Sequence, residues 1–139
     1  MSLEPLDKLV QIGQLKAESP AIAEVDGLVI SAMARLADGG NESLSIESRF
    51  DLIYNAAHSL SLAGLRWHGY RPANRYVVFQ TLAHTLELPA AKWRVLAQAH
   101  DKRNRVEYEG VIEIDTKLVE AMLRVTREIS ERIRRLTSR

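Results

Sequence analysis

The side chains of this sequence that are best suited to chemistry lie in one run, His-Asp-Lys-Arg-Asn-Arg-Val-Glu-Tyr at positions 100–108. On a helix that turns about 100° per residue, the side that holds Trp93 and Leu96 becomes polar within this run. The polar side chains on that side are His100, Arg103 and Glu107. Because burying a polar or charged group is costly unless the group is paired or has a function, this switch from apolar to polar side chains marks the run as a candidate site.

Two interpretations of the run stay open. In the structural one, Arg103 pairs with Glu107 at i+4, and the histidine and tyrosine are satisfied at a helix end or a subunit interface. In the functional one, the run forms a phosphate-binding pocket, with the planar donors of Arg103, the amide of Asn104 and the hydroxyl of Tyr108. Asn104 and Tyr108 lie progressively further round the helix, so such a pocket has to wrap around it.

The four histidines do not predict a metal site, because none forms a close pair with a carboxylate at a recognised zinc spacing. His58 lies one residue beyond the apolar stripe position of Ala57, which favours a place against a neighbouring helix. No glycine-rich phosphate loop and no nucleophile elbow is present. We therefore expect no metal and no cofactor.

A second polar run, upstream of the first, interleaves arginines with aromatic residues. Its members are Arg66, Trp67, Tyr70, Arg71, Arg75 and Tyr76. Such a run is suited to gripping a nucleic-acid backbone and stacking a base. The alternative is a loop of solvated arginines with anchoring aromatic side chains.

Length and composition predict one globular domain over residues 1–139, since 46% of the residues are hydrophobic and 27% charged. The absence of cysteine rules out disulfides and fits a reducing cytoplasm. No export signal or membrane-spanning stretch is visible, and we expect a soluble cytoplasmic protein.

Apolar residues at helical spacing predict helices over about 3–10, 20–36, 46–69, 76–86, 89–108 and 118–136. Ser19-Pro20 is the expected start of the second helix, and only Val111 to Ile114 hints at a strand. Short connections favour antiparallel neighbours. The predicted fold is all-α, a single-domain antiparallel bundle of about five or six helices.

The chain resembles the HEPN family of helical nucleotide-binding domains, whose motif is arginine, commonly asparagine, and a histidine five residues after the arginine. Arg103 and Asn104 match, whereas Tyr108 stands at the histidine position, as in variants that end in an acidic residue and tyrosine. The similarity extends upstream to Tyr54-Asn-Ala-Ala-His58, Gly69-Tyr70-Arg71 and Val78-Phe79, and it covers roughly residues 45 to 136.

This resemblance implies a dimer in a toxin-antitoxin or defence module that binds RNA or a nucleotide. Members with the full motif are metal-independent ribonucleases, in which arginine holds the scissile phosphate and histidine transfers protons. A tyrosine with a pKa near 10 is a poor proton shuttle, so catalysis by this chain is an open question.

The expected catalytic residues are Arg103, Asn104 and Tyr108, and the expected binding residues are His100, Glu107 and His58. Expected partners are a second copy of the chain, RNA or a nucleotide, and an antitoxin or nucleotidyltransferase-type protein. The alternative is a non-catalytic helical subunit that pairs with a nucleotidyltransferase-type protein.

Overall fold

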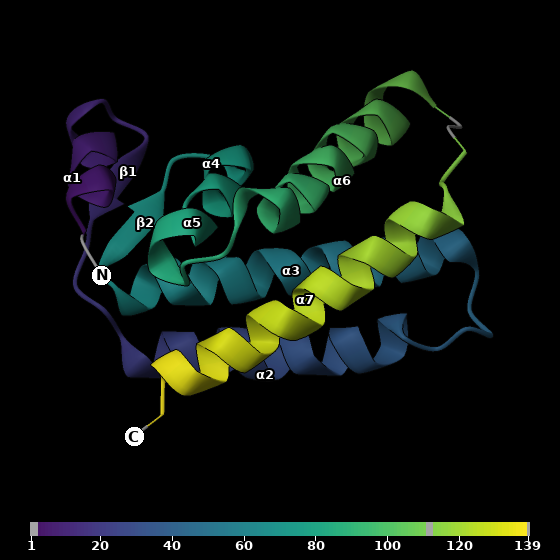
Figure 1. Cartoon of the computed structure of the whole chain (residues 1–139), viewed down its shortest axis with the longest axis horizontal. Helices are drawn as coiled ribbons and strands as arrows, with labels where there is room; N and C mark the ends of the chain where they lie inside the picture. Colours follow the sequence, from purple (N-terminus) through teal and green to yellow (C-terminus); the bar gives the residue numbers. More distant parts are fainter. Residues whose placement is uncertain (1–2, 111–112, 139) are drawn as a thin grey trace.

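The computed structural model describes residues 3–110 and 113–138, and most of them are helical. The helices in Figure 1 are α1 (Glu4–Gln11), α2 (Ile22–Gly39), α3 (Ile46–Trp67), α4 (Arg75–Gln80), α5 (Leu82–Thr85), α6 (Ala90–Glu109) and α7 (Thr116–Leu136). Two short strands, β1 (Leu15–Ala17) and β2 (Tyr70–Pro72), form a small sheet. The prediction of an all-α bundle is confirmed.

The predicted helices are present, with two local differences. The helix expected over 76–86 is divided at Thr81 into α4 and α5, and the Thr81 hydroxyl donates to the carbonyl of Val78 (2.7 Å). The expected cap at Ser19 is wrong, because α2 begins at Ile22 after an extended Ala21. The carbonyl of Ser19 instead accepts a hydrogen bond from Arg66.

Figure 1 shows α2, α3 and α7 lying along the long axis of the molecule, with α4, α5 and α6 on the other side of α3 from α2. Helices that follow each other closely in the chain, such as α2 and α3 or α6 and α7, run antiparallel. The helix α3 is therefore the central element, and it contacts both groups.

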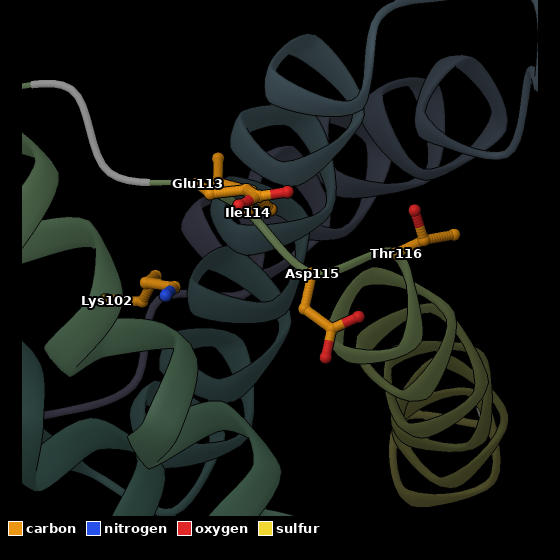
Figure 2. A pocket seen from close by; sticks show the side chains of 5 residues that line it. All are labelled: Lys102, Glu113, Ile114, Asp115 and Thr116. Atoms are coloured by element: carbon orange, nitrogen blue, oxygen red, sulfur yellow. The ribbon is translucent and has the colours of Figure 1, made fainter.

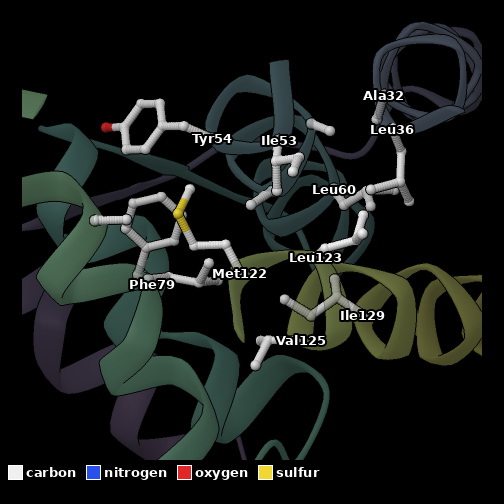
Figure 3. Close-up of a cluster of buried hydrophobic side chains, with 14 of the residues drawn as sticks. Ala32, Leu36, Ile53, Tyr54, Leu60, Phe79, Met122, Leu123, Val125 and Ile129 are labelled. Atoms are coloured by element: carbon white, nitrogen blue, oxygen red, sulfur yellow. The ribbon is translucent and has the colours of Figure 1, made fainter. Parts of the chain in front are cut away.

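The main core lies where α2, α3 and α7 meet, and it continues to α4, α5 and α6, from which Figure 3 shows Phe79 of α4 beside Met122 of α7. The apolar stripe predicted for α3 is buried at Phe50, Ile53, Ala57 and Leu60. Side chains from α2 and α7 close this core, among them Ala32, Leu36, Met122 and Ile129. Burial of these stripes fixes the helices that position the candidate site.

A smaller core at one end joins α1, β1 and β2 to the end of α3. Its buried residues are Leu6, Leu15, Leu65, Tyr70 and Val77. Gly13 adopts a positive φ of 78°, which ends α1 and turns the chain into β1. Leu15 then pairs with Pro72 across the antiparallel sheet. The sequence analysis did not predict these strands.

The strand hint at residues 111–114 falls partly on Val111 and Ile112, which lie outside the described residues. Ile114 is buried in the main core and has no strand conformation. In the described part of the chain, no helix combines the length and the apolar character that crossing a bilayer demands.

Candidate functional site

The helix α6 buries only its first half. Leu96 and Ala99 are buried, whereas every residue from 100 to 110 is partly or fully exposed. In Figure 1 the C-terminal half of α6 runs away from α3 and α7. The polar run at 100–108 therefore lies at the margin of the core, and its charges are not sealed inside it as the helical pattern suggested.

His100 is fixed by hydrogen bonds at both ring nitrogens. Its Nδ1 lies 2.9 Å from the hydroxyl of Tyr54 on α3, and its Nε2 lies 3.2 Å from the amide nitrogen of Asn104, one turn along α6. With that amide donating, Nε2 accepts and Nδ1 carries the proton, which it donates to the Tyr54 oxygen. This arrangement requires a neutral imidazole.

Aromatic rings from α3 and α4 surround this histidine. Tyr54 is fully buried and stacks near His100, with ring centroids 6.3 Å apart and an interplanar angle of 22°. Phe79 meets His100 edge to face at 6.3 Å, and Tyr76 lies 5.8 Å away. His58 packs against Phe79 at 6.1 Å. His58 thus packs against a neighbouring helix, at the same Phe79 ring that contacts His100.

Arg103 extends over the same tyrosine. Its guanidinium carbon lies 5.1 Å from the centroid of the Tyr54 ring, a cation–π contact. One guanidinium nitrogen lies 3.5 Å from a carboxylate oxygen of Glu107, whose side chain is 56% exposed. The i+4 pair of the structural interpretation is thus present, but it is exposed and loose, and such pairs stabilise a helix only by about 0.5 kcal/mol or less.

Arg75 and Arg103 place positive charge beside both histidines. Burial chiefly lowers the pKa of His58 to about 4, and the nearby charges of Arg75, His100 and Arg103 add to this effect. The pKa of His100 is lowered, first by burial and then by Arg103 and Arg75, although Asp101 opposes the shift. Both imidazoles are therefore neutral near pH 7.

We call the set that these contacts define the His100 cluster. It consists of Tyr54, His58, Arg75, Tyr76, Phe79, His100, Arg103 and Asn104. From the sequence, Arg75 and Tyr76 were expected only in the upstream run, and Tyr54 only in the stretch that resembles HEPN domains. The structure thus joins two polar runs that are separate in the sequence.

Tyr108 does not join this cluster. Its side chain is 84% exposed, and five residues along a helix turn it about 140° away from Arg103. Within one copy of the chain, the expected catalytic set therefore consists of two members that lie together, Arg103 and Asn104, and a third that points elsewhere.

The other arginines of the upstream run have structural partners. Arg66 is 1% exposed, and it donates to Glu24 (2.7 Å) and to the carbonyls of Glu18 and Ser19 (2.9 and 2.7 Å). Arg71 pairs with both Glu18 and Glu24, and these arginines lower the pKa of each carboxyl. Arg66 is therefore not a solvated arginine, and the two side chains tie the end of α3 and β2 to Glu18 and to Glu24 in the first turn of α2.

A depression of about 570 Å³ lies between α6 and the start of α7. Figure 2 shows Lys102 of α6 facing Glu113, Ile114, Asp115 and Thr116, which lead into α7. Its lining combines one cation with two acids, and Asp115 already accepts a hydrogen bond from the backbone of Lys117 as the N-cap of α7. This mixture favours no single class of ligand.

Within residues 3–110 and 113–138, no three histidine or acidic side chains are grouped closely enough to hold a metal ion. Comparison with models of protein families, with characterised proteins and with solved structures finds no match for this chain. The resemblance to HEPN domains therefore stays a prediction.

Proposed function

We propose that the His100 cluster binds a phosphate group of RNA or of a nucleotide, and that the chain is a HEPN-like protein of a toxin-antitoxin or defence module. One observation supports this most directly: the guanidinium carbon of Arg103 lies 5.1 Å from the centroid of the Tyr54 ring, and the Tyr54 hydroxyl lies 2.9 Å from Nδ1 of His100, so a cation and an imidazole meet at one buried tyrosine. Arg75 adds a second positive charge, which helps to lower the pKa of both His58 and His100. A guanidinium offers a fork of donors that suits phosphate oxygens.

The balance of charge separates this pair from the other arginines. Arg66 and Arg71 share two carboxylates at close range, and their charge is thereby neutralised. Arg103 has one loose, exposed carboxylate, and Arg75 has no ion-pair partner among the described residues. The two guanidiniums of the His100 cluster are thus opposed only by the exposed carboxylates of Glu107 and Asp101, which leaves them available to an anion.

RNA fits the remaining side chains of the cluster. Tyr76 is 40% exposed beside His100, where its ring is available for stacking on an unpaired base. The amide of Asn104 provides a further donor for a phosphate or sugar oxygen. We include a homodimer in the proposal, because a second copy would bring a second Arg103 and the exposed Tyr108 near this surface.

Binding of a fluorescein-labelled single-stranded RNA of about ten nucleotides, followed by anisotropy, tests the proposal. We expect Arg103→Gln and Arg75→Gln each to weaken binding about tenfold or more, since a charge-assisted hydrogen bond contributes about 1.5–3 kcal/mol. The matched control is Arg35→Gln, because Arg35 is exposed on α2, on the far side of α3. Equal losses in the three variants would contradict a phosphate site at the cluster.

Ribonuclease activity needs a separate experiment. Wild type, Arg103→Ala and Tyr108→Phe are compared in RNA cleavage and in growth inhibition on expression. A metal-independent ribonuclease is supported if the wild type cleaves RNA in the presence of EDTA and the folded Arg103→Ala variant does not. Cleavage that is the same in wild type and Arg103→Ala excludes Arg103 from the reaction.

The exposure of Tyr108 favours a second candidate function, a non-catalytic subunit that pairs with a nucleotidyltransferase-type protein. An exposed aromatic ring is typical of a residue that contacts a partner. A wild-type chain that binds RNA or nucleotide but neither cleaves RNA nor inhibits growth would favour this candidate.

A further inference from the structure

We propose that a cavity between α1, α5 and the start of α6 binds a small aromatic carboxylate, with its ring beside Trp93 and its carboxylate at the ammonium group of Lys8. The cavity has a volume of about 390 Å³. Its walls include Lys8 and Leu9 of α1, Ala83 and His84 of α5, and Trp93 of α6. None of the lining residues belongs to the His100 cluster, so this inference goes beyond the proposed function.

The cavity lies at the junction of the two cores. Leu9 packs against the smaller core, whereas Trp93 packs against the main core. In Figure 1, α4 and α5 lie between α1 and the start of α6, and they supply Gln80, Ala83 and His84 to the lining. Side chains beside an empty space lack the contacts of a filled core, and spaces between helices are common places for small ligands.

The fold holds both walls of the cavity in place. On one side, Leu6 of α1 is fully buried, and the hydroxyl of Tyr70 donates a hydrogen bond to Asp7. On the other side, the start of α6 is tied to α7 by the ion pair of Lys92 with Glu128. A ligand therefore meets walls that are already positioned, which lowers the cost of binding.

The apolar part of the lining suits a flat ring. Leu9 and Ala83 provide aliphatic surface, and the half-buried Trp93 provides the edge or the face of an indole. Aromatic rings pack favourably against such a side chain in stacked or edge-to-face contacts. The volume is near the lower end of the range of about 300–1,000 Å³ that ligand pockets span, so we expect a molecule of one or two rings.

The polar part of the lining suits a single negative charge. Lys8 contributes one positive charge, and none of the side chains that line the cavity is acidic. The ammonium group lies 3.6 Å from a carboxylate oxygen of Glu4, but both side chains are more than 70% exposed, so this pair holds Lys8 only weakly. The amide of Gln80 adds a hydrogen-bond donor. One ammonium group balances a carboxylate, whereas a phosphate monoester has a charge of about −1.5 to −2.

Three probes separate the ring from the charge. They are 1-naphthoate, its neutral amide 1-naphthamide, and acetate, each titrated into the whole ¹⁵N-labelled chain. The chain has two tryptophans, and their indole N–H signals are followed by NMR. Trp93 reports on the cavity, Trp67 at the end of α3 is the internal control, and Trp93→Phe assigns the two signals.

Two pairs of variants test the two parts of the lining. Lys8→Gln removes the charge, and its matched control is Lys16→Gln, at an exposed lysine of β1. Ala83→Leu fills the cavity, and its matched control is Ala34→Leu, at an exposed alanine of α2. Circular dichroism checks the fold of each variant.

We expect 1-naphthoate to move the signal of Trp93 and not that of Trp67, and to bind about fivefold more tightly than 1-naphthamide. Acetate should leave both signals unchanged. In Lys8→Gln the two naphthyl probes should bind equally, whereas Lys16→Gln keeps the difference. Ala83→Leu should weaken both about tenfold or more, because its side chain occupies the space of the ring, and Ala34→Leu should bind as wild type does.

Several results would overturn the inference. A wild type that binds 1-naphthamide as tightly as 1-naphthoate has no carboxylate site at Lys8. Folded Ala83→Leu that binds as wild type does would show that the probe lies elsewhere, and so would a probe that moves neither tryptophan signal or moves both equally. RNA binding at the His100 cluster is measured separately, and none of these results decides it.

Discussion

Replacing His58 by phenylalanine should change how the stability of the fold depends on pH. The histidine is largely buried against Phe79, and its pKa in the folded protein is lowered to about 4 from an ordinary 6.5, chiefly by burial. A phenylalanine at this position keeps a flat ring against Phe79 but cannot be protonated. The difference between the two proteins therefore isolates the titration of this one side chain.

The direction follows from which state binds the proton. Above pH 6.5 neither state is protonated at His58, and its contribution to stability is fully present. Between pH 6.5 and 4 only the unfolded chain is protonated, so the free energy of unfolding decreases as the pH falls. The gap of about 2.5 between the two pKa values corresponds to about 3 kcal/mol in all, of which about 2 kcal/mol is lost between pH 7 and pH 5.

Urea denaturation followed by circular dichroism at pH 7, 6 and 5 measures this effect. We expect the stability of the wild type, relative to His58→Phe, to decrease by about 2 kcal/mol over this range. In Arg75→Gln the decrease should be smaller, because removal of a neighbouring positive charge raises the pKa of His58. Parallel curves for wild type and His58→Phe would refute the assignment of a buried, neutral histidine.

Three further predictions concern the fold, each measured by urea denaturation at pH 7. Arg66→Met should cost about 3–5 kcal/mol, because it leaves buried acceptors without their charged donor, and a loss below about 1 kcal/mol would contradict this. Gly39→Ala should cost about 1–3 kcal/mol, since its Cβ would lie 2.6 Å from a side-chain carbon of Ile53. Gly27→Ala meets open space within α2 and should stabilise the fold by about 0.5–1 kcal/mol. If both variants change the free energy of unfolding in the same direction, this prediction fails. Asp115→Ala removes the N-cap of α7 and should cost about 1 kcal/mol; an unchanged midpoint would show that this cap is dispensable.

The sequence predicted the helices well because each long helix has a regular apolar stripe. In α3 the residues Phe50, Ile53, Ala57 and Leu60 follow this spacing, and all four are buried. The two strands were missed for a physical reason. Each has three residues, too few to show an alternating pattern, and their pairing depends on the contact of Leu15 with Pro72 over a long separation in the chain.

The candidate site was predicted only in part. Helical spacing placed His100 and Arg103 on one side of α6, and the structure brings both to the ring of Tyr54. The spacing could not show that α6 leaves the core after Ala99, because neighbouring helices decide where a helix surface becomes exposed. Helical spacing also could not bring Arg75 near His100, since Arg75 lies on α4 and His100 on α6.

The arginines show most clearly what residue type and spacing leave undetermined. Arg66, Arg71 and Arg75 form one run in the sequence, with similar aromatic neighbours, yet among the described residues only the first two meet carboxylates. Those carboxylates, Glu18 before α2 and Glu24 within it, lie more than 40 residues away in the sequence; Arg66 and Glu24, for example, are 42 residues apart. An arginine whose charge is neutralised in this way stabilises the fold, whereas Arg75 retains its charge beside two neutral histidines. An arginine with only loose, exposed carboxylate partners at a rigid ring cluster, and not the number of arginines in a run, is therefore the property by which we recognise a candidate phosphate site in this chain.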